Sequence, residues 1–79
     1  MKDLLVFLAK SLVLNPNSVS VVEESEANGE IIFKLSVASE DMGRIIGKQG
    51  RIAKAIRTVM KSAATLENVR VNVEIVDTN

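Results

Sequence analysis

Alternation of apolar and polar residues predicts three β-strands in this chain. Residues 31–37 place apolar side chains at every second position, and residues 69–75 repeat the pattern with valine and isoleucine. Residues 19–24 form a shorter run rich in β-branched residues. Asn28-Gly29, between the first two strands, predicts a tight hairpin in which both turn residues have positive φ. Strands with one apolar face each predict a sheet that helices cover on one face only.

Helical spacing predicts three helices around these strands. The first spans residues 3–14 and ends before the chain's one proline, because the residue preceding a proline resists the helical conformation. The second spans residues 39–47 and the third spans residues 51–64. Asp3 and Ser39 are the candidate N-caps of the first two helices. The predicted class is α+β, with the order α-β-β-α-α-β and a three-stranded sheet that carries three helices on one face.

The first predicted helix is apolar on two sides. Phe7 and Leu14 project from one of them. The other side carries four leucines that lie within about 100° of one another, namely Leu4, Leu5, Leu8 and Leu12. A second apolar side either completes the core of so small a domain or meets a partner, and the pattern leaves both alternatives open.

Composition indicates a single small domain spanning residues 1–79. The 79 residues are 47% apolar and 25% charged, which is typical of a globular protein. Cysteine and histidine are both absent, which excludes disulfides, the usual zinc sites, cysteine nucleophiles and histidine bases. We therefore predict no enzyme activity, no cofactor and no metal. Domains this small often gain stability by association, so dimerisation is an option from the start.

The apolar runs of the chain are too short for a membrane span. The longest covers residues 4–9, whereas a spanning helix needs about 20 apolar residues. The chain shows neither a cleavable signal sequence nor a cysteine. The expected location is the cytoplasm.

Basic residues are concentrated in the second half of the chain although the net charge is zero. Residues 40–79 hold seven basic and five acidic groups, while residues 1–39 hold three basic and five acidic groups. The window 42–63 has no acidic residue and six basic ones, namely Arg44, Lys48, Arg51, Lys54, Arg57 and Lys61. Such a local field can attract a polyanion despite a neutral total. The last three lie opposite the apolar side of the third helix, so we expect them mainly as a solvated face.

Gly47-Lys48-Gln49-Gly50 joins the second and third predicted helices. Glycine permits the positive φ that so short a turn needs, and two glycines leave the backbone bare for the close approach of a ligand. The start of the third helix offers unpaired N–H groups that suit a phosphate, and Lys48 and Arg51 add full charges there. The spacing fits neither a Walker A loop nor a dinucleotide fingerprint. A plain helix cap followed by an exposed turn is the structural alternative.

These residues resemble the hallmark I-G-x-x-G-x-x-I of the KH family of single-stranded nucleic-acid binders. Residues 45–50 carry the match, and Ile52 falls one position short of the final isoleucine. The predicted element order resembles the type II arrangement of that family. More narrowly, nearly the whole chain resembles the small bacterial single-KH-domain proteins called KhpA, with similar residues at positions 1–4, 15–16, 41–43 and 46–57.

The resemblance implies a single-stranded RNA-binding protein without catalysis. In that family such a protein acts as an RNA chaperone or post-transcriptional regulator linked to cell elongation, division and wall synthesis. The resemblance also implies a homodimer, or a heteromer with a larger Jag-type RNA-binding protein. The RNA-binding residues that it implies are Ile45, Ile46, Gly47, Lys48, Gln49, Gly50 and Arg51. A dimerisation adaptor with little RNA binding is the alternative function, and single-stranded DNA is a second possible ligand.

The residues around the turn also indicate how a strand would bind. A KH turn clamps about four nucleotides, and we expect Ile45 or Ile46, with Ile32 of the second strand, to form a floor for the bases. The chain has no tyrosine or tryptophan, and Phe7 and Phe33 are expected in the core. Base stacking on aromatic rings, worth about 1–3 kcal/mol per base, is then mostly missing. We expect weak, salt-sensitive binding with little sequence preference. If two or three phosphates are contacted, a plot of log affinity against log salt concentration should have a slope of about −1.4 to −2.

Overall fold

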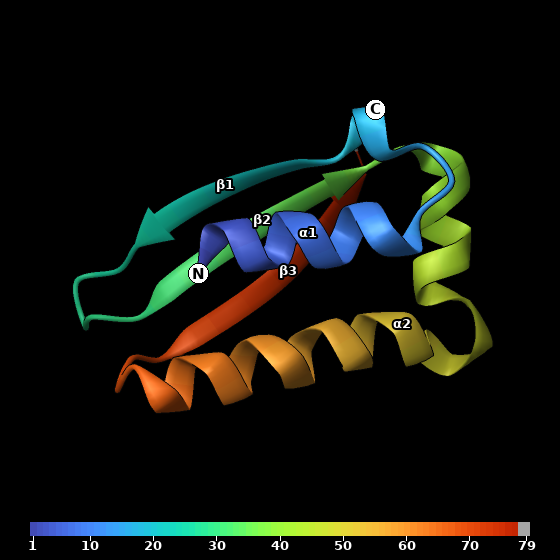
Figure 1. Ribbon diagram of the computed structural model, residues 1–79. Coiled ribbons are helices and arrows are strands. Elements are labelled where there is room, and N and C mark those ends of the chain that lie inside the picture. Colours follow the sequence, from blue (N-terminus) through green and yellow to red (C-terminus); the bar gives the residue numbers. More distant parts are fainter. Residues whose placement is uncertain (78–79) are drawn as a thin grey trace.

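The computed structural model describes residues 1–77, apart from the side chains of Lys48 and Asp77. The strands form one sheet in the order β1-β2-β3, in which β2 is antiparallel to β1 and parallel to β3. The predicted α+β class is confirmed, and Figure 1 shows how the helices lie along the sheet. The elements along the chain are α1 (Lys2–Leu12), the 3-10 helix η1 (Pro16–Ser18), β1 (Ser20–Ser25), β2 (Ile31–Val37), α2 (Ser39–Leu66) and β3 (Val71–Asp77).

The long helix α2 changes direction sharply in its middle. Gln49 and Gly50 have φ values of 64° and 71°, which a right-handed helix does not contain, and the ribbon turns there (Figure 1). α2 therefore consists of an N-terminal segment, residues 39–48, and a C-terminal segment, residues 51–66. These are the second and third predicted helices, so the order α-β-β-α-α-β is confirmed. Gly47 is still helical, because the reversal uses the two residues after Lys48.

One face of the sheet is covered by the helices and the other face is open. Phe33, Leu35 and Val37 are fully buried, whereas the residues between them on β2 are partly exposed. β3 continues this covered face with the buried residues Val71 and Val73. The predicted one-sided sheet is therefore confirmed. The helices contribute to the same core Leu5, Ala9, Ile45, Ala53, Ile56, Met60 and Ala64.

Two turns differ from the sequence-based expectation. β3 begins at Val71, two residues late, because the backbone still completes the end of α2 and the Val69 N–H donates to the Ala64 carbonyl at 3.0 Å. In the hairpin only Gly29 has a positive φ. The predicted two-residue turn, which needs positive φ at both positions, is therefore wrong.

The predicted N-caps are also wrong. Met1 precedes α1 and Ala38 precedes α2, and neither helix start has a side-chain cap. Asp3 lies inside the first turn of α1 instead, where the helix dipole favours a negative charge. Ser39 is the first residue of α2.

α1 has one buried side. Leu5 and Ala9 have no exposed surface, whereas Phe7 is 67% exposed. Leu14 is 66% exposed and lies beyond the end of α1. The expectation that Phe7 belongs to the core is therefore wrong, and the second apolar side of this segment faces outward.

Candidate nucleic-acid interface

The turn of residues 47–50 presents bare backbone at the molecular surface. A Cβ added at Gly47 or at Gly50 would meet no atom within 4 Å. Gln49 adopts its positive φ without being a glycine, and its side chain is exposed. Because the described part of the chain leaves open space at both Cβ positions, a bulky ligand can reach the backbone on either side of Gln49.

The two isoleucines before the turn have opposite surroundings. Ile45 is fully buried in the core, whereas Ile46 is 53% exposed. Of the two, Ile46 has the side chain that a ligand can contact, and Ile45 anchors the N-terminal segment of α2 on the sheet. Arg51, just after the turn, is exposed. The predicted role of the Lys48 side chain lies outside the described residues.

A cavity of about 310 Å³, here called the loop cavity, lies between the C-terminal segment of α2 and β3. Ile46 and Ile75 supply apolar surface, and Lys54 and Arg57 add positive charge. The expected contribution of Ile32 is wrong, because this residue alternates with the buried residues of β2 and lies on the open face of the sheet. The complete lining consists of Ile46, Gln49, Gly50, Ala53, Lys54, Arg57 and Ile75.

Arg57 connects α2 with the free edge of the sheet. Its Nε donates a hydrogen bond to the carbonyl oxygen of Val73 at 3.2 Å. β3 is an edge strand, so this bond satisfies a carbonyl that no neighbouring strand pairs. The terminal guanidinium N–H groups are left to face the loop cavity or solvent. The expectation of a solvated face is therefore wrong for Arg57, since helical spacing does not reveal the strand edge beside it.

Among the described side chains, no carboxylate forms an ion pair with a basic residue next to the turn. One ion pair occurs among the described residues, between Lys34 Nζ and Glu24 Oε1 at 3.0 Å. Arg51 and Lys54 accordingly have no described carboxylate within 4.0 Å. The described part of the chain also contains no cluster of acidic side chains suited to a metal ion. Within residues 1–77, no helix has the length and hydropathy that crossing a bilayer requires.

Asp41 fixes the first turn of α2 against the end of α1. Its buried carboxylate accepts the N–H of Leu14 at 2.9 Å, and both the backbone and side-chain N–H groups of Asn15 at 3.1 Å. The bond from Leu14 is the main cause that holds the pKa of the Asp41 carboxyl below its usual value, against the opposing effect of burial. Arg44 Nε adds a bond to the Leu12 carbonyl at 3.3 Å. The segment that leads into the turn is therefore held at its start.

The turn and the sheet together define a class of nucleic-acid-binding domain. An exposed G-x-x-G turn joins two helical segments, and an apolar cavity with a basic rim lies between the second segment and the edge strand. In an α-β-β-α-α-β fold this combination is a KH domain of type II.

Comparison with known proteins identifies the family within this class. The family described as "KhpA/KhpB, KH domain" matches residues 2–75, and the chain belongs to it. A Clostridium acetobutylicum protein named RNA-binding protein KhpA is 63% identical over 78 residues, covering 96% of this chain and 100% of that protein. A Listeria monocytogenes protein of the same name is 43% identical, covering 98% of this chain and 100% of that protein.

A solved structure confirms the fold at lower sequence similarity. Era from Aquifex aeolicus superposes with a TM-score of 0.61 and 18% sequence identity, covering 95% of this chain and 29% of the Era chain. At this identity the likeness concerns the fold alone. It extends over nearly all of the α-β-β-α-α-β unit described here.

Proposed function

We propose that the chain binds single-stranded RNA at the turn of residues 47–50. The observation that carries this proposal is the uncovered backbone of Gly47 and Gly50 beside the loop cavity. Relatives over nearly the full length of the chain bear the name RNA-binding protein KhpA. Membership of this family also fits the prediction that the chain is not an enzyme.

Each part of the site has a separate task in this proposal. Gly47 and Gly50 let the sugar–phosphate chain approach the backbone, and Arg51 and Lys54 supply unpaired positive charge. Lys48 lies within the turn in the sequence, between Gly47 and Gln49, and adds a further positive charge there. Ile46 and Ile75 give the bases an apolar surface, while Ile45 acts from the core as support.

The proposed binding is weak and has little sequence preference. Phe33 is fully buried and Phe7 lies on α1, so neither aromatic ring lines the loop cavity. Affinity then rests on phosphate contacts and on apolar contact with the bases, without stacking on aromatic rings. Contacts to the sugar–phosphate chain also carry little sequence information.

We further propose the cellular role that the resemblance implies. The chain would act in the cytoplasm as an RNA chaperone or post-transcriptional regulator linked to cell elongation, division and wall synthesis. A binder with low sequence preference suits such a role, because it can act on many transcripts.

The proposed partner is a second copy of this chain or a larger Jag-type RNA-binding protein. Phe7 in the middle of α1 and Leu14 just beyond its end, with two thirds of their surface exposed, support an apolar contact along this segment. Replacing Phe7 with Ser should lower the fraction of dimer measured by sedimentation velocity and leave the fold unchanged by circular dichroism. An unchanged sedimentation profile would place the contact elsewhere.

A charge reversal at the turn tests RNA binding. The variant Lys48→Asp/Gln49→Asp puts negative charge where a phosphate should lie, and we expect it to abolish binding to a single-stranded RNA at two salt concentrations. The control variant Lys2→Asp/Asn17→Asp makes the same change of charge at exposed positions of α1 and η1, and it should bind nearly as the wild type does.

The same variants distinguish RNA binding from a dimerisation adaptor. Intact RNA binding by Lys48→Asp/Gln49→Asp, with an unchanged thermal melt, would refute the proposed site. Loss of dimer in that variant with RNA binding retained would support the adaptor. A DNA strand of the same sequence, used as competitor, measures the preference for RNA.

A further inference from the structure

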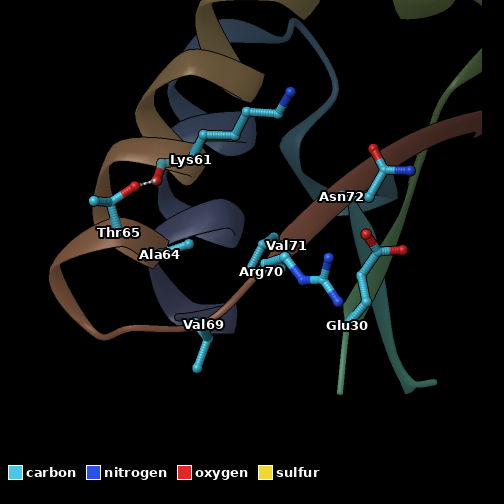
Figure 2. Close-up of a pocket in the computed structure, with 8 residues that line it drawn as sticks. All are labelled: Glu30, Lys61, Ala64, Thr65, Val69, Arg70, Val71 and Asn72. Carbon is cyan, nitrogen blue, oxygen red and sulfur yellow. Dashed lines mark hydrogen bonds between the residues drawn. The ribbon is translucent and has the colours of Figure 1, made fainter. Parts of the chain in front are cut away.

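A second cavity, here called the far cavity, lies at the other end of the C-terminal segment of α2. It has a volume of about 330 Å³ and is formed by the last turns of α2, the start of β3 and Glu30. Figure 2 shows Lys61 and Thr65 on the helix side, and Arg70, Asn72 and Glu30 on the strand side. The loop cavity and the far cavity therefore share the same two walls, α2 and β3, at opposite ends.

The charges of the far cavity suit a phosphate. Lys61 and Arg70 are cations that come from two different elements, and neither has a described carboxylate within 4.0 Å, because the one ion pair joins Lys34 and Glu24. Glu30 is the acidic residue of the lining. The cavity therefore has a net positive charge, although Glu30 weakens the field.

The backbone around the far cavity is held in place by hydrogen bonds. The Arg70 carbonyl accepts the N–H of Ile31 at 2.9 Å, and the Glu30 N–H donates to the Asn28 side chain at 3.0 Å. The Thr65 hydroxyl donates to the Lys61 carbonyl at 3.0 Å. The two cations thus extend from fixed positions, so a bound phosphate needs to order their side chains alone.

We propose that the far cavity is a second RNA contact, in which Lys61 and Arg70 hold phosphates of a strand whose other part occupies the turn of residues 47–50. This inference rests on the proposed RNA binding and extends its footprint beyond four nucleotides. Asn72 and Thr65 add polar groups to the same cavity, and Ala64, Val69 and Val71 complete its lining.

The spacing of the two cavities fits one continuous strand. Gly50 and Lys61 are eleven positions apart, which corresponds to about 16 Å at a rise of 1.5 Å per residue. This distance equals about five nucleotides at a stacked spacing of about 3.4 Å, and fewer if the strand is extended. A tetranucleotide has three phosphodiesters, which the turn alone can engage. A decanucleotide has enough to reach both cavities.

The test compares these two oligonucleotides by fluorescence anisotropy. The variant Lys61→Gln/Arg70→Gln should leave tetranucleotide binding unchanged and weaken decanucleotide binding. Loss of two phosphate contacts makes the plot of log affinity against log salt concentration less steep by about 1.4. The ratio of wild-type to variant affinity should therefore fall about sevenfold between 50 mM and 200 mM salt. The control variant Lys2→Gln/Lys10→Gln removes the same charge from α1, and should change neither slope.

A second variant gives a result that misfolding cannot imitate. Glu30→Gln removes the negative charge of the far cavity, so it should tighten decanucleotide binding about twofold and leave tetranucleotide binding unchanged. In NMR spectra, the amide signals of Thr65, Arg70 and Asn72 should shift with the decanucleotide but not with the tetranucleotide.

The possible failures are distinguishable. If Lys61→Gln/Arg70→Gln binds the decanucleotide with the wild-type slope, or if it weakens both oligonucleotides equally, the second contact is refuted while RNA binding at the turn stands. If the wild type binds neither oligonucleotide, the proposed function and this inference both fail.

Discussion

Replacing Gly47 and Gly50 separately with alanine should change stability in opposite directions and weaken RNA binding in both variants. Gly47 is helical, so alanine there should stabilise the fold by about 0.5–1 kcal/mol. Gly50 has a φ of 71°, and an L side chain in this region costs about 1–2 kcal/mol. Neither new Cβ meets an atom within 4 Å, so backbone conformation alone decides the difference of about 2 kcal/mol.

This difference is large enough to measure by thermal unfolding. In a domain of this size 1 kcal/mol corresponds to about 4–8 °C, so the two variants should melt about 8–16 °C apart. RNA affinity, measured by anisotropy below both melting temperatures, should fall in both, because each Cβ occupies space that the sugar–phosphate chain needs. The stabilised Gly47→Ala variant gives the clearer test of close approach to the backbone, since its loss of affinity cannot come from unfolding.

Gly43→Ala is the matched control. Gly43 is also helical and also has open space around its Cβ, but it lies one helical turn before Gly47 and outside the turn of residues 47–50. It should gain stability as Gly47→Ala does and keep full RNA affinity. If Gly47→Ala binds RNA as tightly as Gly43→Ala, close approach to the backbone is not what the turn provides. If Gly50→Ala melts with the wild type, the left-handed conformation of the turn is refuted.

Three further substitutions test the core, the α1–α2 connection and the loop cavity. Ile56→Ala removes a side chain that is 1% exposed, and urea unfolding should show a loss of about 2–5 kcal/mol; a loss below 1 kcal/mol would mean that the core is less well packed than described. The Asp41 carboxyl has a lowered pKa in the folded state. Its contribution to folding stability is therefore fully present above the pKa of about 3.9 that it has in the unfolded chain, and is lost as the pH falls through the folded pKa. The melting temperature of Asp41→Asn should therefore be lower than that of the wild type at pH 7, and the difference should shrink as the pH falls below the unfolded pKa; a constant difference would contradict the assignment. Ile46→Ser changes a side chain that is 53% exposed, so the stability should stay within about 0.5 kcal/mol while RNA affinity falls; unchanged affinity would remove Ile46 from the binding surface.

The strands and the turn could be predicted from the sequence because each depends on local chemistry. The alternation in residues 31–37 follows from the two-residue period of a strand, and the structure gives β2 the same bounds. Gly50 marks the reversal because few other residues tolerate positive φ, whereas the positive φ of Gln49 and the helical conformation of Gly47 were not visible in the sequence. The exposed position of Phe7 is harder to predict, since the sequence pattern of an apolar residue is the same whether it packs inside the domain or faces outward.

The walls of the loop cavity depend on tertiary structure and were not predictable in the same way. Ile75 lines the cavity because β3 is the edge strand beside α2, and strand order is not encoded in the pattern of any single strand. The bond from Arg57 to Val73 has the same origin. The position of Ile32 does follow from the sequence. The two-residue period of a strand places it on the other face of the sheet from Phe33, and hence away from the helices.

A chain with no net charge can attract RNA at the turn because part of its negative charge lies far from the turn. The acidic residues Glu23 and Glu26 lie near the hairpin between β1 and β2, at the opposite end of the molecule from the bend in α2 (Figure 1). The longest dimension is 34 Å, while the Debye length is about 10 Å at 0.1 M salt and about 30 Å at 0.01 M. The carboxylates of Glu23 and Glu26 are therefore screened from the turn at moderate salt but not at low salt.

This separation predicts the shape of the salt dependence. For a tetranucleotide, the log–log plot of affinity against salt should be straight above 0.1 M, with a slope of about −1.4 to −2. It should flatten towards 0.01 M, where repulsion from the hairpin reaches the turn. The variant Glu23→Gln/Glu26→Gln should keep the slope above 0.1 M and continue it to lower salt. Flattening that persists in this variant would show that the acidic hairpin is not its cause, because the substitution removes that repulsion and leaves the turn intact.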